Sequence, residues 1–226
     1  MKKILLIAIV IAITSCSSKY IKFSPTKNEI YTTERLSQFL KENKNPKVVL
    51  RTPVTSIKAT EEEDVSFLYG AIEKEFLSQG FIVRDRSLFN QVVANNQNSV
   101  NYSKLKDKTD TDLIIELIKI DGEILYETNK YTTEKGKTGL LVTPYKRYGA
   151  AVEFKVVLID NNEFAGTFKF NYAPCSKNNK CVINESWKKR VKRINKGKES
   201  YEKVKNNDLE DFIRGATREL VNDMRN

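Results

Sequence analysis

The sequence predicts an α+β fold in which helices pack on one face of a mixed α/β sheet. Two observations lead to this prediction. Short apolar strands alternate with helical patterns between residues 47 and 93, and a meander of strands follows between residues 112 and 172. One more helical pattern, over residues 208–224, closes the chain. The predicted order is therefore β-α-β-α-β-β-β-β-α.

Two short strands and a long helix open this order. Residues 47–52 and 81–83 are apolar runs of strand length. Between them, Thr60 and Glu63 have the spacing of a capping box, which predicts a helix that begins there and ends at Gly80. Apolar residues at helical spacing predict its buried face. They are Val65, Leu68, Ile72, Phe76 and Leu77.

A second helix is predicted after the strand 81–83. Asp85 is placed to cap this helix, and the Asn95–Asn96 pair ends it. Residues 98–111 are polar and predict a loop. The apolar face of the helix consists of Leu88, Phe89, Val92 and Val93.

The meander is predicted to hold four strands. The first is apolar on both faces, which is typical of a central strand. Asp121–Gly122 predicts a tight turn after it, and residues 136–139 predict a loop further on. The predicted strands are residues 112–120, 123–133, 150–159 and 163–172.

A signal peptide is predicted at the start of the chain. Residues 1–3 form a short basic start, residues 4–13 have no polar side chain, and small residues precede Cys16. The apolar run is shorter than the ~20 residues that a membrane-spanning helix needs. Residues 13–16 resemble the bacterial lipobox, and this resemblance implies lipidation of Cys16 and cleavage before it. An ordinary signal peptide with a chance cysteine is the alternative.

The lipobox resemblance sets the expected domain boundaries. Residues 1–15 would be a lipoprotein signal peptide, and residues 16–46 a lipidated tether with polar, loop-like stretches. Residues 47–226 would form a single α/β domain, with a basic segment at residues 184–205. The acyl chains on Cys16 would attach the protein to the membrane.

The chain is basic, with a formal net charge of +10 over 226 residues. Residues 184–205 hold nine Lys and Arg against three Glu. In an exported protein, such a segment favours an acidic protein partner, an anionic lipid or an anionic glycan over nucleic acid. A solvated loop without a ligand is the alternative. The candidate binding residues are Trp187, Lys188, Lys189, Arg190, Lys192 and Arg193.

The sequence has no histidine, which excludes Ser-His-Asp and Cys-His catalysis and zinc sites built on histidine. We therefore expect neither an enzyme nor a bound cofactor. Cys175 and Cys181 are expected to form a disulfide, because exported compartments are oxidising. A metal site is the weaker alternative, because two Cys without His would make at most half of one.

Three segments resemble a periplasmic superfamily that includes the curli-secretion-channel lipoproteins, the lipoprotein activators of penicillin-binding proteins and the amino-terminal domain of TolB. They are residues 68–93, residues 111–117 and the hairpin at residues 152–163. The resemblance implies a non-enzymatic lipoprotein that binds a protein partner as an accessory or scaffold in envelope assembly. Because Ser17 rather than Asp follows Cys16, the resemblance to lipoproteins of Gram-negative cells implies the outer membrane, and we expect the protein to face the periplasm.

An oligomeric outer-membrane channel subunit of the curli-secretion type is the alternative function. Residues 123–150 could supply one membrane-crossing hairpin. Residues 171–206 would have to supply the second, and charged residues that face lipid cost about 2–4 kcal/mol each near the bilayer midplane. The basic character of this second stretch disfavours the channel.

Overall fold

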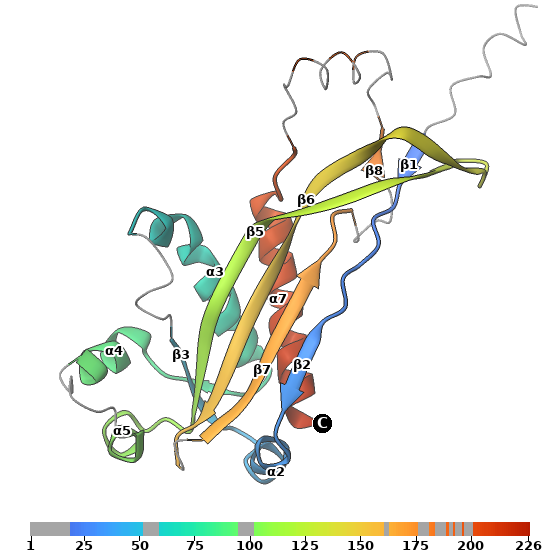
Figure 1. Cartoon of the computed structure of the whole chain (residues 1–226). Coiled ribbons are helices and arrows are strands. Elements are labelled where there is room, and N and C mark those ends of the chain that lie inside the picture. Colours follow the sequence, from blue (N-terminus) through green and yellow to red (C-terminus); the bar gives the residue numbers. More distant parts are fainter. Residues whose placement is uncertain are drawn as a thin grey trace, which may run out of the picture. The chain divides into compact units, whose positions relative to one another are not determined.

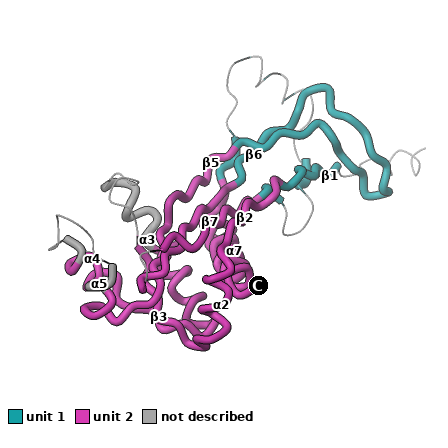
Figure 2. Tube along the Cα trace, turned by 60° about the horizontal axis from the view of Figure 1, so that its bottom comes forward, with its two compact units in different colours: residues 1–25, 125–149, 173–203 teal, residues 26–124, 150–172, 204–226 magenta. Residues whose placement is uncertain are grey.

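The structure is a computed structural model, which describes residues 19–51, 59–94, 102–160, 163–175, 181–183, 189, 192, 196 and 201–226. The chain divides into two compact units, coloured teal and magenta in Figure 2. The smaller unit comprises residues 1–25, 125–149 and 173–203, and the larger unit comprises residues 26–124, 150–172 and 204–226. The segment expected to form a single domain, residues 47–226, is therefore divided between both units.

Eight strands are described: β1 (Lys19–Ile21), β2 (Glu29–Thr32), β3 (Lys47–Arg51), β4 (Ile82–Val83), β5 (Leu113–Thr133), β6 (Thr138–Leu158), β7 (Glu163–Tyr172) and β8 (Cys181–Val182). In the larger unit, neighbouring strands follow the order β2-β7-β6-β5, and β3 pairs with both β5 and β4. In the smaller unit, β1 pairs with the end of β5 and with β8.

The predicted α/β mixed sheet is wrong, because a large antiparallel sheet dominates the fold. β2 pairs antiparallel with β7, β7 with β6, and β1 with β5 and β8. The parallel pairs are those of β3 with β4 and β5. β3 and β4 contribute little to the sheet, since they have 5 and 2 residues whereas β5 and β6 have 21 residues each.

The tight turn predicted at Asp121–Gly122 does not form, and β5 runs through both residues. Local bonds satisfy the Asp121 carboxylate within the strand: Lys119 Nζ donates to Oδ2 at 2.8 Å, and Glu123 N–H donates to Oδ1 at 3.0 Å. The Lys119 bond is the main cause of the lowered pKa of Asp121. The chain turns back at Gly136 instead, whose φ of 75° is a conformation that glycine adopts without strain. The two strands predicted at residues 112–120 and 123–133 are therefore one strand, β5.

Three helices cover one face of the sheet in the larger unit (Figure 1). They are α2 (Glu34–Glu42), α3 (Ala59–Ser78) and α7 (Asn206–Arg225). Their buried side chains share one core with β3, β5, β6 and β7. α3 and α7 confirm two predicted helices, and Gly80 follows α3 with a φ of 84°, as a helix-ending glycine does.

Helix α4 (Arg86–Ala94) packs on the opposite face, so the prediction that the helices share one face is wrong. Its Phe89 is buried in a second, smaller core of strand residues that alternate with those of the first. Asp85 caps α4 as predicted, accepting a hydrogen bond from Leu88 N–H at 2.8 Å. A further helix, α5 (Tyr102–Thr109), lies within the region predicted as a polar loop.

Residues 16–46, expected to be a tether, hold β1, β2 and α2 in the part that the structure describes. Ile21 in β1 and Leu36 in α2 are both fully buried. Thr33 caps α2, since its Oγ1 accepts from Leu36 N–H at 3.4 Å. The described residues of this region are therefore part of the folded units.

A buried carboxylate joins α3 to α7. Glu75 is 5% exposed, and Arg218 donates to it from Nε (2.9 Å) and from a terminal nitrogen (3.2 Å). The Arg218 bond is the main cause of the lowered pKa of Glu75. A lowered pKa means that the Glu75 carboxyl holds its proton less tightly in the folded protein than in the unfolded chain. The contribution of the Glu75–Arg218 pair to stability is therefore complete at neutral pH and is lost as the solution becomes acidic.

Replacing Arg218 by Met should lower the free energy of unfolding at neutral pH, because Glu75 would keep its buried charge without its main partner. The variant should then lose less additional stability on acidification than the wild type does. Urea titrations at neutral and acidic pH measure both effects, with Glu75→Gln as the control that removes the titrating group. An Arg218→Met variant with the pH dependence of the wild type would contradict the assignment.

Candidate functional site

The predicted binding residues lie mostly outside the described residues. The structure describes two of the six, Lys189 and Lys192, and both are exposed. The other four and the predicted lipidation site lie outside the described residues: Trp187, Lys188, Arg190, Arg193 and Cys16. The described residues on either side of 184–200 have the contacts given below.

A disulfide and an arginine are in contact in the smaller unit. Cys175 and Cys181 are joined by a disulfide, with Cα atoms 5.5 Å apart, which confirms the predicted pair. One terminal nitrogen of Arg147 donates to both sulfurs, at 3.0 and 2.9 Å. The other terminal nitrogen pairs with the carboxylate of Glu202. The guanidinium thus ties β6 to the disulfide and to Glu202, near the end of the basic segment.

The described residues on both sides of 184–200 have contacts within the smaller unit. Before this segment, β8 pairs with β1. After it, Tyr148 N–H donates to the Glu202 carbonyl at 3.3 Å, and the Tyr201 ring meets the Tyr148 ring edge to face with centroids 5.8 Å apart.

The two units have opposite charge balances. The segments of the smaller unit hold nineteen Lys and Arg against five Glu, whereas those of the larger unit hold twenty Lys and Arg against twenty-four Asp and Glu. The smaller unit is therefore basic as a whole, beyond the segment singled out in the sequence. Such a charge attracts anionic surfaces over roughly 8–10 Å at physiological salt.

Strand β2 forms an edge of the sheet in the larger unit. It pairs with β7, and no other described strand pairs with it. All four of its residues are exposed, with Tyr31 at 68%. Thr33 N–H donates to the Ala165 carbonyl at 3.0 Å, so by alternation the backbone groups of Tyr31 face β7 and those of Ile30 and Thr32 face outward. An open edge of this kind can accept an added strand.

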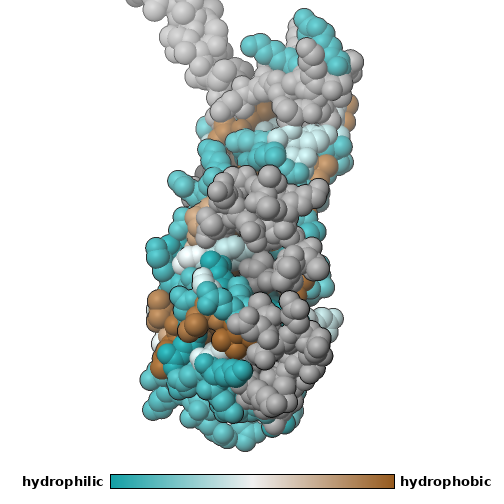
Figure 3. All heavy atoms as spheres, turned by 90° about the vertical axis from the view of Figure 1, so that its left-hand side faces the viewer, coloured by the Kyte–Doolittle hydropathy of each residue, from teal (hydrophilic) through white to brown (hydrophobic). Residues whose placement is uncertain are grey.

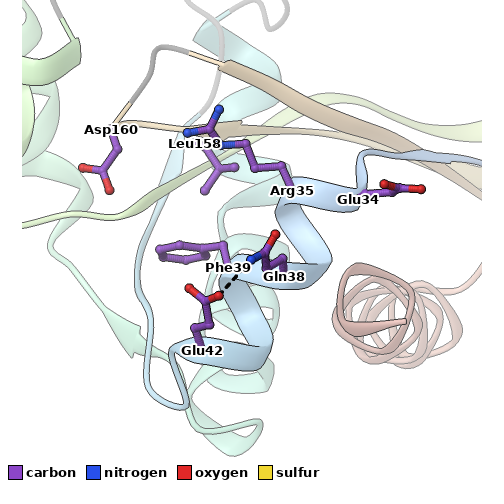
Figure 4. Close-up of a pocket in the computed structure, with 7 residues that line it drawn as sticks. All are labelled: Glu34, Arg35, Gln38, Phe39, Glu42, Leu158 and Asp160. Atoms are coloured by element: carbon purple, nitrogen blue, oxygen red, sulfur yellow. Dashed lines mark hydrogen bonds between the residues drawn. The ribbon is translucent and has the colours of Figure 1, made fainter.

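A cavity of about 660 Å³ lies in the larger unit beside α2 and the end of β6 (Figure 4). Gln38 Nε2 donates to the Glu42 carboxylate at 3.0 Å, and Arg35 and Asp160 each form an ion pair with a neighbouring side chain. These groups of the lining are therefore engaged with neighbouring side chains. Its lining consists of Glu34, Arg35, Gln38, Phe39, Glu42, Leu158 and Asp160.

The acidic residues near the start of β5 are also engaged. Glu116 is 8% exposed and pairs with Arg51 at 2.9 Å and with Lys155 at 3.2 Å. Asp112 accepts a hydrogen bond from Lys47 N–H at 2.9 Å. The described residues include no group of three or more His, Cys, Asp or Glu side chains suited to a metal ion. Within the same residues, no helix is both long enough and apolar enough to cross a bilayer.

Sequence reasoning missed two features that could carry function. The contacts of Arg147 were not visible in the sequence, because its partners lie 28, 34 and 55 positions away. The edge strand β2 is only four residues long and lies in a stretch that reads as a tether. Figure 3 shows one face of the molecule, on which hydrophobic residues form small patches among hydrophilic ones. The sequence does not predict such patches, because they depend on which side chains the fold leaves exposed.

No protein-family model matches the chain, and no curated protein matches it. Among solved structures, the chain is similar to the PelC dodecamer from Paraburkholderia phytofirmans, with 8% sequence identity, coverage of 88% of this chain and 96% of that chain, and a TM-score of 0.40. It is also similar to a PDZ domain protein from Parabacteroides distasonis, with 9% identity, coverage of 84% and 37%, and a TM-score of 0.32.

Proposed function

We propose that this chain is a non-enzymatic lipoprotein, anchored to the outer membrane through Cys16 and facing the periplasm, that binds a protein partner as a scaffold in envelope assembly. The lipobox resemblance of residues 13–16 supports the anchor. The resemblance of residues 68–93 to periplasmic lipoproteins supports the scaffold role. The Cys175–Cys181 disulfide is typical of an exported protein.

The observation that carries the proposal is the open edge of β2. A strand of the partner would bond to the outward N–H and C=O groups of Ile30 and Thr32. The edge is also held in place: Asn171 N–H donates to Asn28 Oδ1 at 3.0 Å, and Lys169 pairs with Glu29 at 2.6 Å. Because little ordering is needed on this side, more of the contact energy is available for affinity.

Replacing Ile30 by Pro should weaken partner binding by roughly tenfold or more, because proline removes the outward N–H and blocks an added strand. The inward bonds of β2 to β7 would be kept, so the fold should be retained. The test is photo-crosslinking in native membranes from a reactive residue placed at Thr32. The crosslinked adduct should be present in the Ile30→Val control and lost in Ile30→Pro.

Failure of the wild type to form an adduct at residue 32, or an adduct that persists in Ile30→Pro, would contradict this proposal. An adduct with twice the mass of the chain would instead identify a second copy at the edge. That result would favour the second candidate, an oligomeric channel subunit, for which the long hairpin of β5 and β6 is the supporting observation. Mass photometry of the solubilised protein would then show a ring rather than a single chain.

A further inference from the structure

The sheet of the smaller unit has one covered face. Phe23 lies against the rings of Tyr126 and Tyr145, with centroids 6.3 and 6.4 Å away. Ile21 and Cys181 pair across β1 and β8, and they are 0% and 4% exposed. These buried side chains define the covered face.

Side chains that alternate with these lie on the other face of the sheet. The 3.4 Å ion pair of Lys146 with Glu127 places the even-numbered residues of this part of β6 on the same side as Glu127 of β5. Val182 is on this side because it follows the buried Cys181 in β8. Four large apolar residues are exposed here, and we call them the hydrophobic face. They are Leu125 (45% exposed), Leu140 (68%), Val142 (89%) and Val182 (44%).

Exposed lysines accompany the hydrophobic face in the same unit. They include Lys22, Lys130, Lys135 and Lys137. Exposed apolar side chains together with cations are the combination that binds anionic bilayers: the apolar groups enter the boundary between headgroups and acyl chains, and the cations are attracted to the headgroup phosphates.

The length of chain before β1 also points to a membrane. β1 begins at Lys19 and is paired with β5, with Lys19 opposite Thr133 and Ile21 opposite Tyr131. Only three residue steps separate Lys19 from Cys16, and they span at most about 10 Å. An acylated Cys16, as in the proposed function, would therefore hold the sheet of the smaller unit close to the lipid headgroups.

We propose that the hydrophobic face docks on an anionic bilayer surface, with Leu140 and Val142 at the boundary of the acyl chains and the lysines on the headgroup phosphates. The placement rests on the lipid anchor of the proposed function. The contact itself needs no acyl chain, so it can be measured without the anchor and without the partner at β2.

The test uses the unacylated mature chain, residues 16–226 with Cys16→Ser, and vesicles made of equal parts phosphatidylglycerol and phosphatidylcholine. The chain should co-sediment with these vesicles and not with pure phosphatidylcholine. The double change Leu140→Asp and Val142→Asp should lower the vesicle affinity by roughly tenfold or more. The matched control is Leu77→Asp with Leu88→Asp in the larger unit, where the exposed fractions are 56% and 58%, and it should bind like the parent chain.

A second measurement does not depend on the folding of the aspartate variants. An environment-sensitive dye on Val142→Cys should shift to the blue on anionic vesicles, whereas the same dye on Ser87→Cys should not. Several results would overturn the proposal: no sedimentation with anionic vesicles, equal losses in the two double variants, or no spectral shift at residue 142. Binding lost only when the basic residues 188–193 become Gln would likewise overturn it in favour of that segment alone.

The outcome is separable from that of the proposed function. Ile30→Pro, which tests the partner site at β2, should leave vesicle binding unchanged. If the chain binds anionic vesicles but forms no adduct from residue 32, the membrane contact is supported and the scaffold role is contradicted. If the adduct forms but the chain does not bind anionic vesicles, the scaffold role is supported and the membrane contact is contradicted.

Discussion

Replacing Phe154 by Ala should lower the free energy of unfolding by about 3–5 kcal/mol. Phe154 is fully buried in β6, lies opposite Phe168 in the register with β7, and packs edge to face on Phe170 with ring centroids 6.3 Å apart. The substitution removes a ring from the centre of the core that α2, α3 and α7 share with the sheet. Because this packing is dense, neighbouring side chains would fill only part of the cavity.

The matched control is Phe164→Ala in β7, since Phe164 is 50% exposed and lies outside that core. It should cost no more than about 1 kcal/mol. Urea titration followed by circular dichroism measures both variants. Equal losses in Phe154→Ala and Phe164→Ala would show that the helices do not cover this face of the sheet.

The elements predicted well are those with strong local signals. α3 was predictable because apolar residues such as Leu68, Ile72 and Phe76 recur at helical spacing and Gly80 follows them. α7 was predictable for the same reason, and Asp85 gave the start of α4. In each case, the residues that decide the structure lie within one or two helical turns of one another.

The elements predicted poorly depend on contacts far along the chain. Asp121–Gly122 has the composition of a turn, yet it lies inside a strand whose register is set by pairing over 21 residues. β1 and β2 have three and four residues, too few for a periodic pattern. They are held by pairing with strands remote in sequence: β1 with β5 and β8, and β2 with β7. Helix α4 covers the second face because Phe89 meets strand residues that are remote in sequence.

The features of the candidate site divide in the same way, into those with local signals and those that depend on contacts far along the chain. The Cys175–Cys181 disulfide followed from the export signal and the close spacing, which are local features. The contacts of Arg147 with the disulfide and with Glu202 join two separate segments of the smaller unit, residues 125–149 and 173–203. The hydrophobic face could not be recognised either, because alternation in a strand does not show which side stays exposed.

Replacing Cys16 by Ala should abolish stable membrane attachment, and this is the largest effect that we predict. Each buried CH₂ of an acyl chain contributes about 0.8 kcal/mol, so several chains on Cys16 would hold the protein permanently, whereas one chain binds only marginally. In cell fractionation, the wild type should stay in the membrane pellet through a high-salt wash. Cys16→Ala should leave the pellet or accumulate as an uncut precursor.

High salt separates the anchor from the weaker contacts of the smaller unit. Attraction between its lysines and anionic headgroups is screened at high ionic strength, but burial of acyl chains is not. Any Cys16→Ala protein that stays in the pellet at low salt should therefore be released by the wash, unless it is an uncut precursor. Labelled palmitate gives an independent measurement, because it should enter the wild type and not Cys16→Ala. Equal incorporation into both proteins would contradict lipidation at Cys16.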